Sequence, residues 1–510
     1  MKSFMENSCI VIPCPIPVIL SPSFVILSDP LRGLQKDRAK DLRVNSAKNL
    51  AGSSAQQPFR GGKKRLRMTQ ESLSVFLILS LFFSAFSSPA FAADLEKEEL
   101  TLGFIKLTDS APIIIAKEKG FFEEEGLSVS VEAQANWKVL MDRVIDGQLD
   151  GSHMLAPAPL GHTEGLLTKA DIIVPYVMSE NGAGISVSNE VWEKMKPNLK
   201  LQEDGKPVHP ISASAMKPMV DEYKHEGKPF RMAMTYPVGI HNYSLRYWLA
   251  AGGIHPGFYT PTDTNGFTDG DVQLSVTPPP QMPAVLQSGT VQGVCVNDPW
   301  HTAISTRGIG VPVTSSLFTH RGLPDKVFGV TRAWAEKNPK TLKAVVRALM
   351  KAGKWLDESP KNRREASIIL SQPQYVGADP EVLARMLMGK FGYGEDDIRE
   401  EPDWDVFFRG HATYPYYSGA IWWLTQVRRW GQLDSKPNEW YLELAKKVYR
   451  PDIWEEAAKE LVKEGKLAET DIPQTDGFKE LPAENFIDGI PFDGKHPNEY
   501  LQKFAIGKKG

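Results

Sequence analysis

The sequence predicts an α/β fold in which helices cover both faces of parallel sheets. After residue 93, short apolar runs that are typical of strands alternate with stretches of helical periodicity. The run at 127–132 alternates apolar and polar residues, as a half-buried strand does. Alternating strands and helices are typical of parallel sheets with helices on both faces. The chain has 510 residues, 42% of them hydrophobic and 24% charged, which excludes a disordered, collagen-like or polytopic membrane protein.

The predicted elements follow one another along most of the chain. Strands are predicted at 100–105, 127–132, 149–155, 172–177, 231–235, 272–276 and 291–296. Helices are predicted at 111–122, 138–147, 241–252, 282–289 and 338–350. Two segments rich in Pro, charged residues or Asp/Gly/Thr, 197–210 and 255–271, are predicted to be loops. The C-terminal third is predicted to be rich in helices, and it is aromatic.

The N-terminus carries a predicted signal peptide at residues 68–92. A basic segment at 63–67 precedes an apolar run at 75–86, and small residues follow as far as Ala92, after which cleavage is expected. The apolar run is too short to span a bilayer. We therefore expect export to the periplasm with no stable membrane insertion after processing. Residues 1–67 are predicted to be an untranslated or disordered extension, because the methionine that follows opens a complete signal; a long leading segment is the alternative.

The net charge and the positions of the cysteines argue against a nucleic-acid partner and against an intrachain disulfide. Residues 1–92 carry a net charge of +7, so the rest of the chain carries −10, which argues against a nucleic-acid partner. Of the three cysteines only Cys295 survives the expected processing, and it lies in an apolar run at 291–296. A buried, inert thiol and no intrachain disulfide are expected.

No sequence motif indicates catalysis. The chain lacks a phosphate-binding loop, a dinucleotide-binding glycine motif that opens a helix after a strand, a zinc-binding His-Glu-x-x-His helix and a nucleophile elbow. None of the ten histidines pairs with a cysteine at ligand spacing. We predict no catalytic residues, no metal and no cofactor. An exported α/β protein without catalytic motifs is expected to bind a ligand.

Collinear motifs give the chain a resemblance to a known family. They are Gly103–Pro112, Ala116–Phe122, Ala135–Trp137, Asn181–Val187, Met234–His241, Arg246–Ile254, Pro278–Met282, Asn297–Trp300, Tyr414–Tyr416, Trp423–Gln426, Arg429–Gly431 and Ile487–Gly489. In this order they resemble the nitrate- and bicarbonate-binding proteins of ABC importers, over about residues 99–505. Each motif alone is weak evidence for the family, whereas the shared order of all the motifs is specific to it.

The resemblance implies a two-lobed clamshell of the periplasmic-binding-protein type. Residues 94–183 and 310–510 would build the first lobe, with a helix-rich C-terminal extension packed on it, and residues 184–309 the second lobe. The ligand would lie in the cleft, which closes by a hinge motion. The implied partners are a small inorganic anion and the permease and ATPase subunits of an ABC transporter. Nitrate or nitrite is the favoured ligand. Bicarbonate, cyanate, an organic sulfonate or a role as the ligand-sensing partner of a signalling system are the alternatives, and an enzyme of this fold is disfavoured.

A buried oxyanion needs a hydrogen-bond donor for nearly every oxygen, because an unpaired buried charge is costly. By resemblance, the ligand-binding residues are Thr108, Trp137, Ala183, Gly184, Gly239, His241 and Lys326. Trp137 offers an indole N–H, Lys326 an ammonium group and Thr108 a hydroxyl. His241 follows a strand at the start of a helix, where Gly239 lets the backbone approach the ligand closely. Asp109 is expected to cap the next helix or to orient a donor.

One departure from the family pattern affects the choice of anion. The nitrate-type proteins would have a glutamine at the position of Ala183, and its amide could donate to the anion. Bicarbonate carries an O–H and needs an acceptor, which Asp298 could supply, although Asp298-Pro-Trp is also a typical helix start. Because specificity is a difference of affinities, one substituted donor can change which anion binds best.

Overall fold

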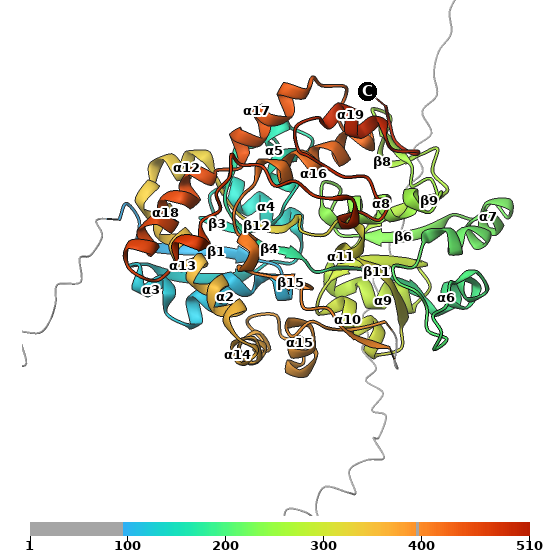
Figure 1. Ribbon diagram of the computed structural model, residues 1–510, viewed down its shortest axis with the longest axis horizontal. Coiled ribbons are helices and arrows are strands. Elements are labelled where there is room, and N and C mark those ends of the chain that lie inside the picture. The colour runs from blue at the N-terminus through green and yellow to red at the C-terminus, as the bar shows by residue number, and fades with distance from the viewer. Residues whose placement is uncertain (1–94, 394–396, 510) are drawn as a thin grey trace, which may run out of the picture. The chain divides into compact units, whose positions relative to one another are not determined.

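The computed structural model describes residues 95–393 and 397–509 and contains two large mixed sheets (Figure 1). The predicted signal peptide and the extension at 1–67 lie outside the described residues. The first sheet has six strands in the order β15-β4-β12-β3-β1-β2. Its strands are β1 (Glu99–Phe104), β2 (Ser128–Ala133), β3 (Gly151–Leu155), β4 (Ile172–Asn181), β12 (Pro324–Thr331) and β15 (Asp405–Val406).

Helices cover both faces of the first sheet, as predicted. One face packs against a group that shares one buried apolar cluster: α2 (Ala111–Glu118), α3 (Phe121–Glu124), α13 (Pro339–Glu358), α14 (Pro360–Leu370) and α18 (Pro451–Lys463). The other face packs against α4 (Trp137–Ile145), α5 (Ala158–Glu164) and α17 (Asn438–Val448). Two further helices lie in this part of the sequence: α12 (Arg332–Lys337) follows β12, and α15 (Pro380–Leu387) follows α14.

The second sheet has five strands in the order β11-β5-β10-β6-β9. They are β5 (Ala183–Ser188), β6 (Phe230–Met234), β9 (Val272–Val276), β10 (Gly293–Asn297) and β11 (Gly310–Ser315). A separate apolar cluster holds α9 (Met282–Gln287) and α10 (Trp300–Thr306) against it. The accompanying helices are α6 (Asn189–Met195), α7 (Lys217–His225), α8 (Ile240–Ala251) and α11 (Ser316–Thr319).

Both sheets are mixed rather than purely parallel, which corrects the sequence-based expectation. In the first sheet β1 runs parallel to β2 and β3, but β12 runs antiparallel to β3 and β4. In the second, β6 runs parallel to β9 and β10, but β5 runs antiparallel to β10 and β11. β5 and β12 are the strands by which the chain enters one sheet from the other. A strand that starts at the edge where the neighbouring strands end must run in the opposite direction.

The chain passes from the first sheet to the second at Gly182 and returns between residues 316 and 323. β11 therefore pairs within the second sheet, although the sequence analysis assigned residues from 310 onward to the first lobe. No strand is predicted at 310–315 from the sequence, so the prediction contains no strand pairing that would assign this segment to a sheet. Asn181 and Gly182 both have positive φ values, 68° and 89°.

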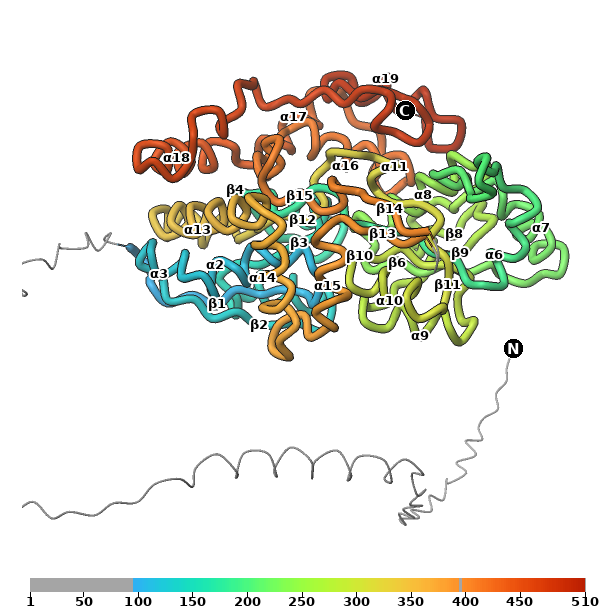
Figure 2. The backbone as a smooth tube through the Cα atoms, turned by 60° about the horizontal axis from the view of Figure 1, so that its bottom comes forward, coloured from blue at the N-terminus to red at the C-terminus, as the bar shows by residue number. Residues whose placement is uncertain are grey.

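The C-terminal residues extend along both sheets (Figure 2). α17 packs on α5 and β4, and α18 packs on α13 and β4, both at the first sheet. α16 (Tyr417–Arg429) also reaches the second sheet, where Trp422 and Trp423 meet Tyr247 and Tyr243 of α8 with ring centroids 5.8 and 6.1 Å apart. α19 (Pro497–Gln502) packs on α16.

Most predicted elements are confirmed to within a few residues, but one predicted loop is wrong in part. Residues 255–271 contain β7 (Phe258–Thr260) and β8 (Asp263–Thr268), which pair with each other. The Asp263 carboxylate accepts hydrogen bonds from the backbone N–H groups of Asn265, Gly266 and Phe267, which tightens the turn. The strands β13 (Lys390–Gly392) and β14 (Ile398–Glu400) form a second small pair.

No helix within residues 95–393 and 397–509 has the length and apolar character needed to cross a bilayer.

The crossover at Gly182 makes this glycine difficult to replace. A Cβ atom there would lie 2.3 Å from Asp405 Oδ1, and the φ of +89° is one that side chains rarely adopt. We expect Gly182→Ala to lower the free energy of unfolding by about 3 kcal/mol. Gly253→Ala, at a φ of +76° with open space around it, is the matched control and should cost about 1 kcal/mol. Urea unfolding measures both, and equal losses would show that the contact with Asp405 is unimportant.

Candidate functional site

The carboxyl ends of strands from both sheets and the beginning of β12 converge on a buried polar cluster. From the first sheet come Asp109 after β1, Trp137 at the start of α4, His153 in β3 and Lys326 in β12. From the second sheet comes His241, in the first turn of α8 after β6. The ends of strands at a point where the chain changes sheet are the usual place for a ligand site in α/β proteins.

Lys326 lies at the centre of this cluster with its ammonium group fully buried. Its Nζ is 2.9 Å from Asp109 Oδ2 and 2.6 Å from Asp325 Oδ2. Burial by itself would lower the pKa of Lys326, but the charges of Asp109 and Asp325 outweigh burial and raise the pKa. The lysine is therefore charged, and two of its three N–H groups are directed at carboxylates.

Asp109 orients donors, as the sequence analysis proposed. Its Oδ1 lies 2.8 Å from His153 Nε2, while its Oδ2 faces Lys326. Burial would raise the pKa of Asp109, but Lys326 and His153 lower it to about 2. Burial lowers the pKa of His153, so a neutral imidazole donates to a charged carboxylate. Asp109 thus fixes two donors at one point.

Trp137 supplies a buried donor without a partner. The side chain is only 2% exposed, and its ring centroid lies 5.2 Å from that of His153. Within the described part of the chain, its indole Nε1 makes no hydrogen bond. A buried N–H group without an acceptor is rare and calls for an explanation. A ligand that accepts a hydrogen bond at this point would supply one.

His241 connects to the same cluster from the second sheet. Its Nδ1 lies 2.6 Å from the Thr235 hydroxyl, and its Nε2 donates to Asn297 Oδ1. The amide nitrogen of Asn297 in turn donates to Asp325 Oδ2 over 2.7 Å. Burial, followed by the charge of Lys326, lowers the pKa of His241 to about 3. A neutral His241 is therefore linked to Lys326 through Asn297 and Asp325.

Thr108 joins the two sheets instead of presenting a free hydroxyl. Its backbone N–H donates to the Asp298 carbonyl at 2.9 Å, and its Oγ1 lies 3.3 Å from that carbonyl and 3.4 Å from Asp405 Oδ2. Trp300 makes a similar bridge, with its Nε1 donating to the Lys106 carbonyl at 3.0 Å. These bonds hold β1 and β10 together at the cluster.

The three remaining predicted residues are backbone positions. Ala183 donates from its N–H to Ser316 Oγ at 3.2 Å, close to where the chain returns to the first sheet. A Cβ atom on Gly184 would lie 2.3 Å from the His301 ring, so this glycine allows α10 to pack. A Cβ atom on Gly239 would lie 2.8 Å from Leu155 Cδ1, so this glycine lets α8 approach β3 of the first sheet. Of the predicted residues, Trp137, His241 and Lys326 lie in or beside one polar cluster, whereas Gly184 belongs to a packing contact.

Asp298 belongs to a helix start, the second of the two interpretations that the sequence allowed. Its Oδ1 accepts from the N–H and the hydroxyl of Thr302, and its Oδ2 accepts from Trp404 Nε1 at 2.8 Å. Both oxygens are thus in use. Burial raises the pKa of Asp298 to about 6. Cys295, on β10, is buried and free, and burial raises the pKa of its thiol.

Sequence reasoning missed three members of the cluster: His153, Asn297 and Asp325. Asp325 stands next to Lys326 in the chain, and Asn297 stands at the end of a predicted strand, so position alone could have indicated both. His153 lies inside a predicted strand, where a buried histidine is usually a packing residue. Within residues 95–393 and 397–509, no three His, Cys, Asp or Glu side chains are placed to hold a metal ion.

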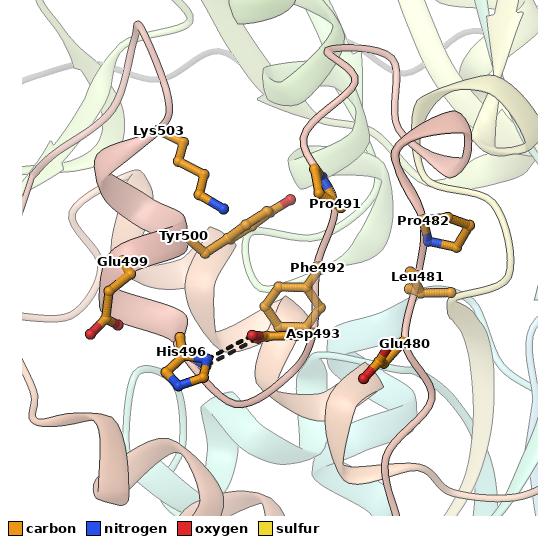
Figure 3. A pocket seen from close by; sticks show the side chains of 10 residues that line it. All are labelled: Glu480, Leu481, Pro482, Pro491, Phe492, Asp493, His496, Glu499, Tyr500 and Lys503. Atoms are coloured by element: carbon orange, nitrogen blue, oxygen red, sulfur yellow. Dashed lines mark hydrogen bonds and ion pairs between the residues drawn. The ribbon is translucent and has the colours of Figure 1, made fainter.

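A separate cavity of about 450 Å³ lies among C-terminal residues (Figure 3). Its wall includes the carboxylates of Glu480, Asp493 and Glu499, and His496 is paired with Asp493 at 2.6 Å. None of the predicted anion-binding residues lines it. With three carboxylates around it, this cavity is unsuited to a small anion.

Comparison with known proteins gives a consistent result. Residues 93–371 match the model of the NMT1-like family. The chain is 35% identical over 418 residues to the nitrate/nitrite binding protein NrtA of Synechococcus elongatus, covering 80% of this chain and 86% of that protein. It is 31% identical to the bicarbonate-binding protein CmpA of the same organism, covering 81% and 88%. The crystal structure of the periplasmic nitrate-binding protein NrtA from Synechocystis aligns with a TM-score of 0.70 at 31% identity, covering 81% of this chain and 100% of that one.

The low pKa of His241 predicts a pH-dependent contribution to stability. An unfolded histidine titrates near pH 6.5, whereas the folded pKa of His241 is about 3. Between these values the unfolded chain binds a proton that the folded protein does not, so this residue lowers the stability as the pH falls from 6.5 to 3. His241→Gln keeps an N–H near the position of Nε2 but does not titrate.

We therefore expect the free energy of unfolding of the His241→Gln variant to fall less steeply with acidification than that of the parent, by about 1 kcal/mol per pH unit. Urea unfolding between pH 4 and 6.5 measures the two slopes. His225→Gln, at an exposed position, serves as the control and should keep the parent slope. Equal slopes for the parent and His241→Gln would contradict the low pKa of His241 in the folded protein.

Proposed function

Since the chain belongs to the NMT1-like family, together with the nitrate- and bicarbonate-binding relatives named above, we propose that it is the substrate-binding protein of an ABC importer and captures a small oxyanion. Nitrate or nitrite is the favoured ligand. The resemblance inferred from the motifs and the predicted fold class are both confirmed by the family match and by the structural alignment. The relatives are transport proteins, and we propose that this chain likewise binds its ligand without chemical change.

The unpartnered indole N–H of Trp137 is the observation that carries this proposal. It is a donor held inside the protein, beside His153 and the Asp109–Lys326 pair. An oxyanion placed there would accept from Trp137 and from the third N–H of Lys326. Two donors for a buried anion are thus already in place, which lowers the cost of taking it out of water.

The electrostatics of the cluster are compatible with a bound anion. Lys326 is charged, whereas both histidines are neutral and add no charge. The single N–H of each histidine is directed at a protein acceptor, Asp109 for His153 and Asn297 for His241. Burial raises the pKa of Asp325 to about 7. The charge of Lys326, whose Nζ lies 2.6 Å from Asp325 Oδ2, opposes this increase.

We further propose that the two sheets mark two lobes that close on the ligand. The first lobe would comprise residues 95–181 and those from 324 onward, and the second lobe residues 183–315. Gly182 and residues 316–323 would form the hinge. Trp137, His241 and Lys326 would contact the ligand, and Gly239 would bring the first turn of α8 close to it. Thr108 and Ala183 would shape the contact between the lobes, and Gly184 would let α10 pack on the second sheet.

We also propose a periplasmic location, after removal of the signal peptide, and delivery of the anion to permease and ATPase subunits. A basic segment, an apolar run and a small-residue cleavage site support export.

Bicarbonate is the second candidate because one observation favours it. Two carboxylates, Asp109 and Asp325, flank Lys326, and either could accept a hydrogen bond from the O–H of bicarbonate. Nitrate has no such hydrogen to donate.

A titration with small anions tests the proposal directly. We expect nitrate or nitrite at about 100 times its dissociation constant to raise the melting temperature of the purified protein by about 3 °C. Sulfate at equal ionic strength is the control and should produce no saturable shift. A larger shift with bicarbonate would favour the second candidate. No saturable shift with nitrate, nitrite, bicarbonate, cyanate or an organic sulfonate would overturn the proposed function.

Trp137→Phe isolates the contribution of the indole N–H. The variant keeps an aromatic ring in the core and breaks no hydrogen bond within the protein. We therefore expect stability to change little, while the affinity for the anion falls about tenfold. Trp422→Phe is the matched control, because the Trp422 Nε1 donates to the Tyr500 hydroxyl at 3.0 Å, away from the cluster. It should lower the stability and leave the affinity unchanged, as measured by calorimetric titration. An unaltered affinity in Trp137→Phe would exclude contact between this indole and the ligand.

A further inference from the structure

The register of the second sheet places two side chains of different chemistry directly opposite each other. β5 and β10 are antiparallel, and Ala183 pairs with Asn297. Side chains directly opposite each other in an antiparallel pair lie on the same face of the sheet, with Cβ atoms about 5 Å apart. Both residues are 1% exposed. Ala183 brings only a methyl group to this position, whereas Asn297 brings an amide.

The Asn297 amide connects the two halves of the polar cluster. Its oxygen accepts from His241 of α8, and its nitrogen donates to Asp325 Oδ2 over 2.7 Å. The same Asp325 oxygen lies 2.6 Å from the Lys326 Nζ. Asn297 therefore lies between two of the residues that the proposed function assigns to the ligand.

The hydrogen bonds that the Asn297 amide makes within the protein also determine which of its N–H and C=O groups is left to bind a ligand. An amide has two N–H groups, and the oxygen of Asn297 is engaged by His241. Among the described residues, the nitrogen donates only to Asp325. The second N–H therefore remains available. A group that presents N–H suits an oxyanion whose oxygens are all acceptors.

The surroundings hold this amide in place before any ligand arrives. A Cβ atom on Gly182, at the crossover between the sheets, would lie 3.2 Å from Asn297 Nδ2. The backbone of the crossover therefore packs against the amide on one side, while His241 and Asp325 fix its two ends. A donor that is already oriented loses little conformational freedom on binding.

We infer that Asn297 is a specificity-determining residue of the anion site, and that its amide supplies from β10 the hydrogen bond that the methyl group of Ala183 cannot supply from β5. The inference rests on the proposed function and deepens it. The ligand class that it selects is a small oxyanion that carries no hydrogen of its own, such as nitrate or nitrite.

Asn297→Ala tests the inference, with nitrate and nitrite as the probes. We expect the dissociation constant of the anion that the parent protein binds most tightly to rise about tenfold. In the double variant Ala183→Gln/Asn297→Ala, the longer glutamine side chain can reach across from the neighbouring strand. We expect the double variant to recover at least part of the lost affinity, which a purely structural role of Asn297 would not predict.

Asn338→Ala is the matched control for the loss of a buried amide. Asn338 is 4% exposed, and its Nδ2 donates to the Trp334 carbonyl at 2.8 Å, outside the cluster. It should lower the unfolding midpoint and leave the dissociation constant unchanged. If Asn297→Ala does not fold, as judged by circular dichroism, Asn297→Ser takes its place and is assessed by the same criteria.

The possible outcomes separate this inference from the proposed function. If the parent protein binds nitrate or nitrite and the Asn297 variant binds it equally well, the role of Asn297 is overturned while the proposed function stands. If Asn297→Ala and Asn338→Ala weaken binding equally, the role of Asn297 is structural and the inference is overturned. If the parent protein binds neither nitrate nor nitrite, the role of Asn297 is overturned, and the proposed function is overturned as well only if bicarbonate, cyanate and an organic sulfonate also fail to bind.

Discussion

The structure depends on one buried cation, the ammonium group of Lys326 between Asp109 and Asp325. Removing Lys326 would leave the two buried carboxylates without their shared counter-ion, and breaking a buried ion pair in this way costs about 3–5 kcal/mol. Each partner of Lys326 also has a second role. Asp109 fixes His153, and Asp325 accepts from Asn297 on the other sheet. The position of the ammonium group therefore sets both the internal order of the site and the approach of the two sheets.

The topology explains why this group lies where the sheets meet. Strands β1, β2 and β3 run parallel and end at the same edge, so the residues that follow them are brought together. β12 enters the sheet at that edge and runs in the opposite direction, which places Lys326, near its first residue, among them. The equivalent arrangement holds in the second sheet, where β5 begins beside the end of β10. A chain that changes sheet twice thus brings residues that are distant in sequence into one buried cluster.

Much of this arrangement follows from local patterns, and the rest depends on pairing between distant segments. Period and apolar content placed β1, β2, β9 and α8 to within a residue or two. Local patterns do not show which strand returns to which sheet, so they missed the antiparallel β5 and β12 and the place of β11. Trp137, His241 and Lys326 were predicted from motifs that resemble a family, and the structure places them in or beside the polar cluster. Asn297 was missed because its importance arises from its pairing with Ala183 and its contact with Asp325, and neither is visible in a linear sequence.

The aromatic contact between α16 and α8 has a mechanical consequence. Trp422 and Trp423 of α16 contact Tyr247 and Tyr243 of α8. These residues are far in sequence from the two crossovers. This contact joins the two sheets at a place other than the crossovers and the polar cluster. Two attachments define an axis and allow a wide rotation, whereas a third attachment away from that axis restricts its amplitude. In the proposed closure of the two lobes these four rings would have to slide over one another, so their contact would limit the angle of rotation.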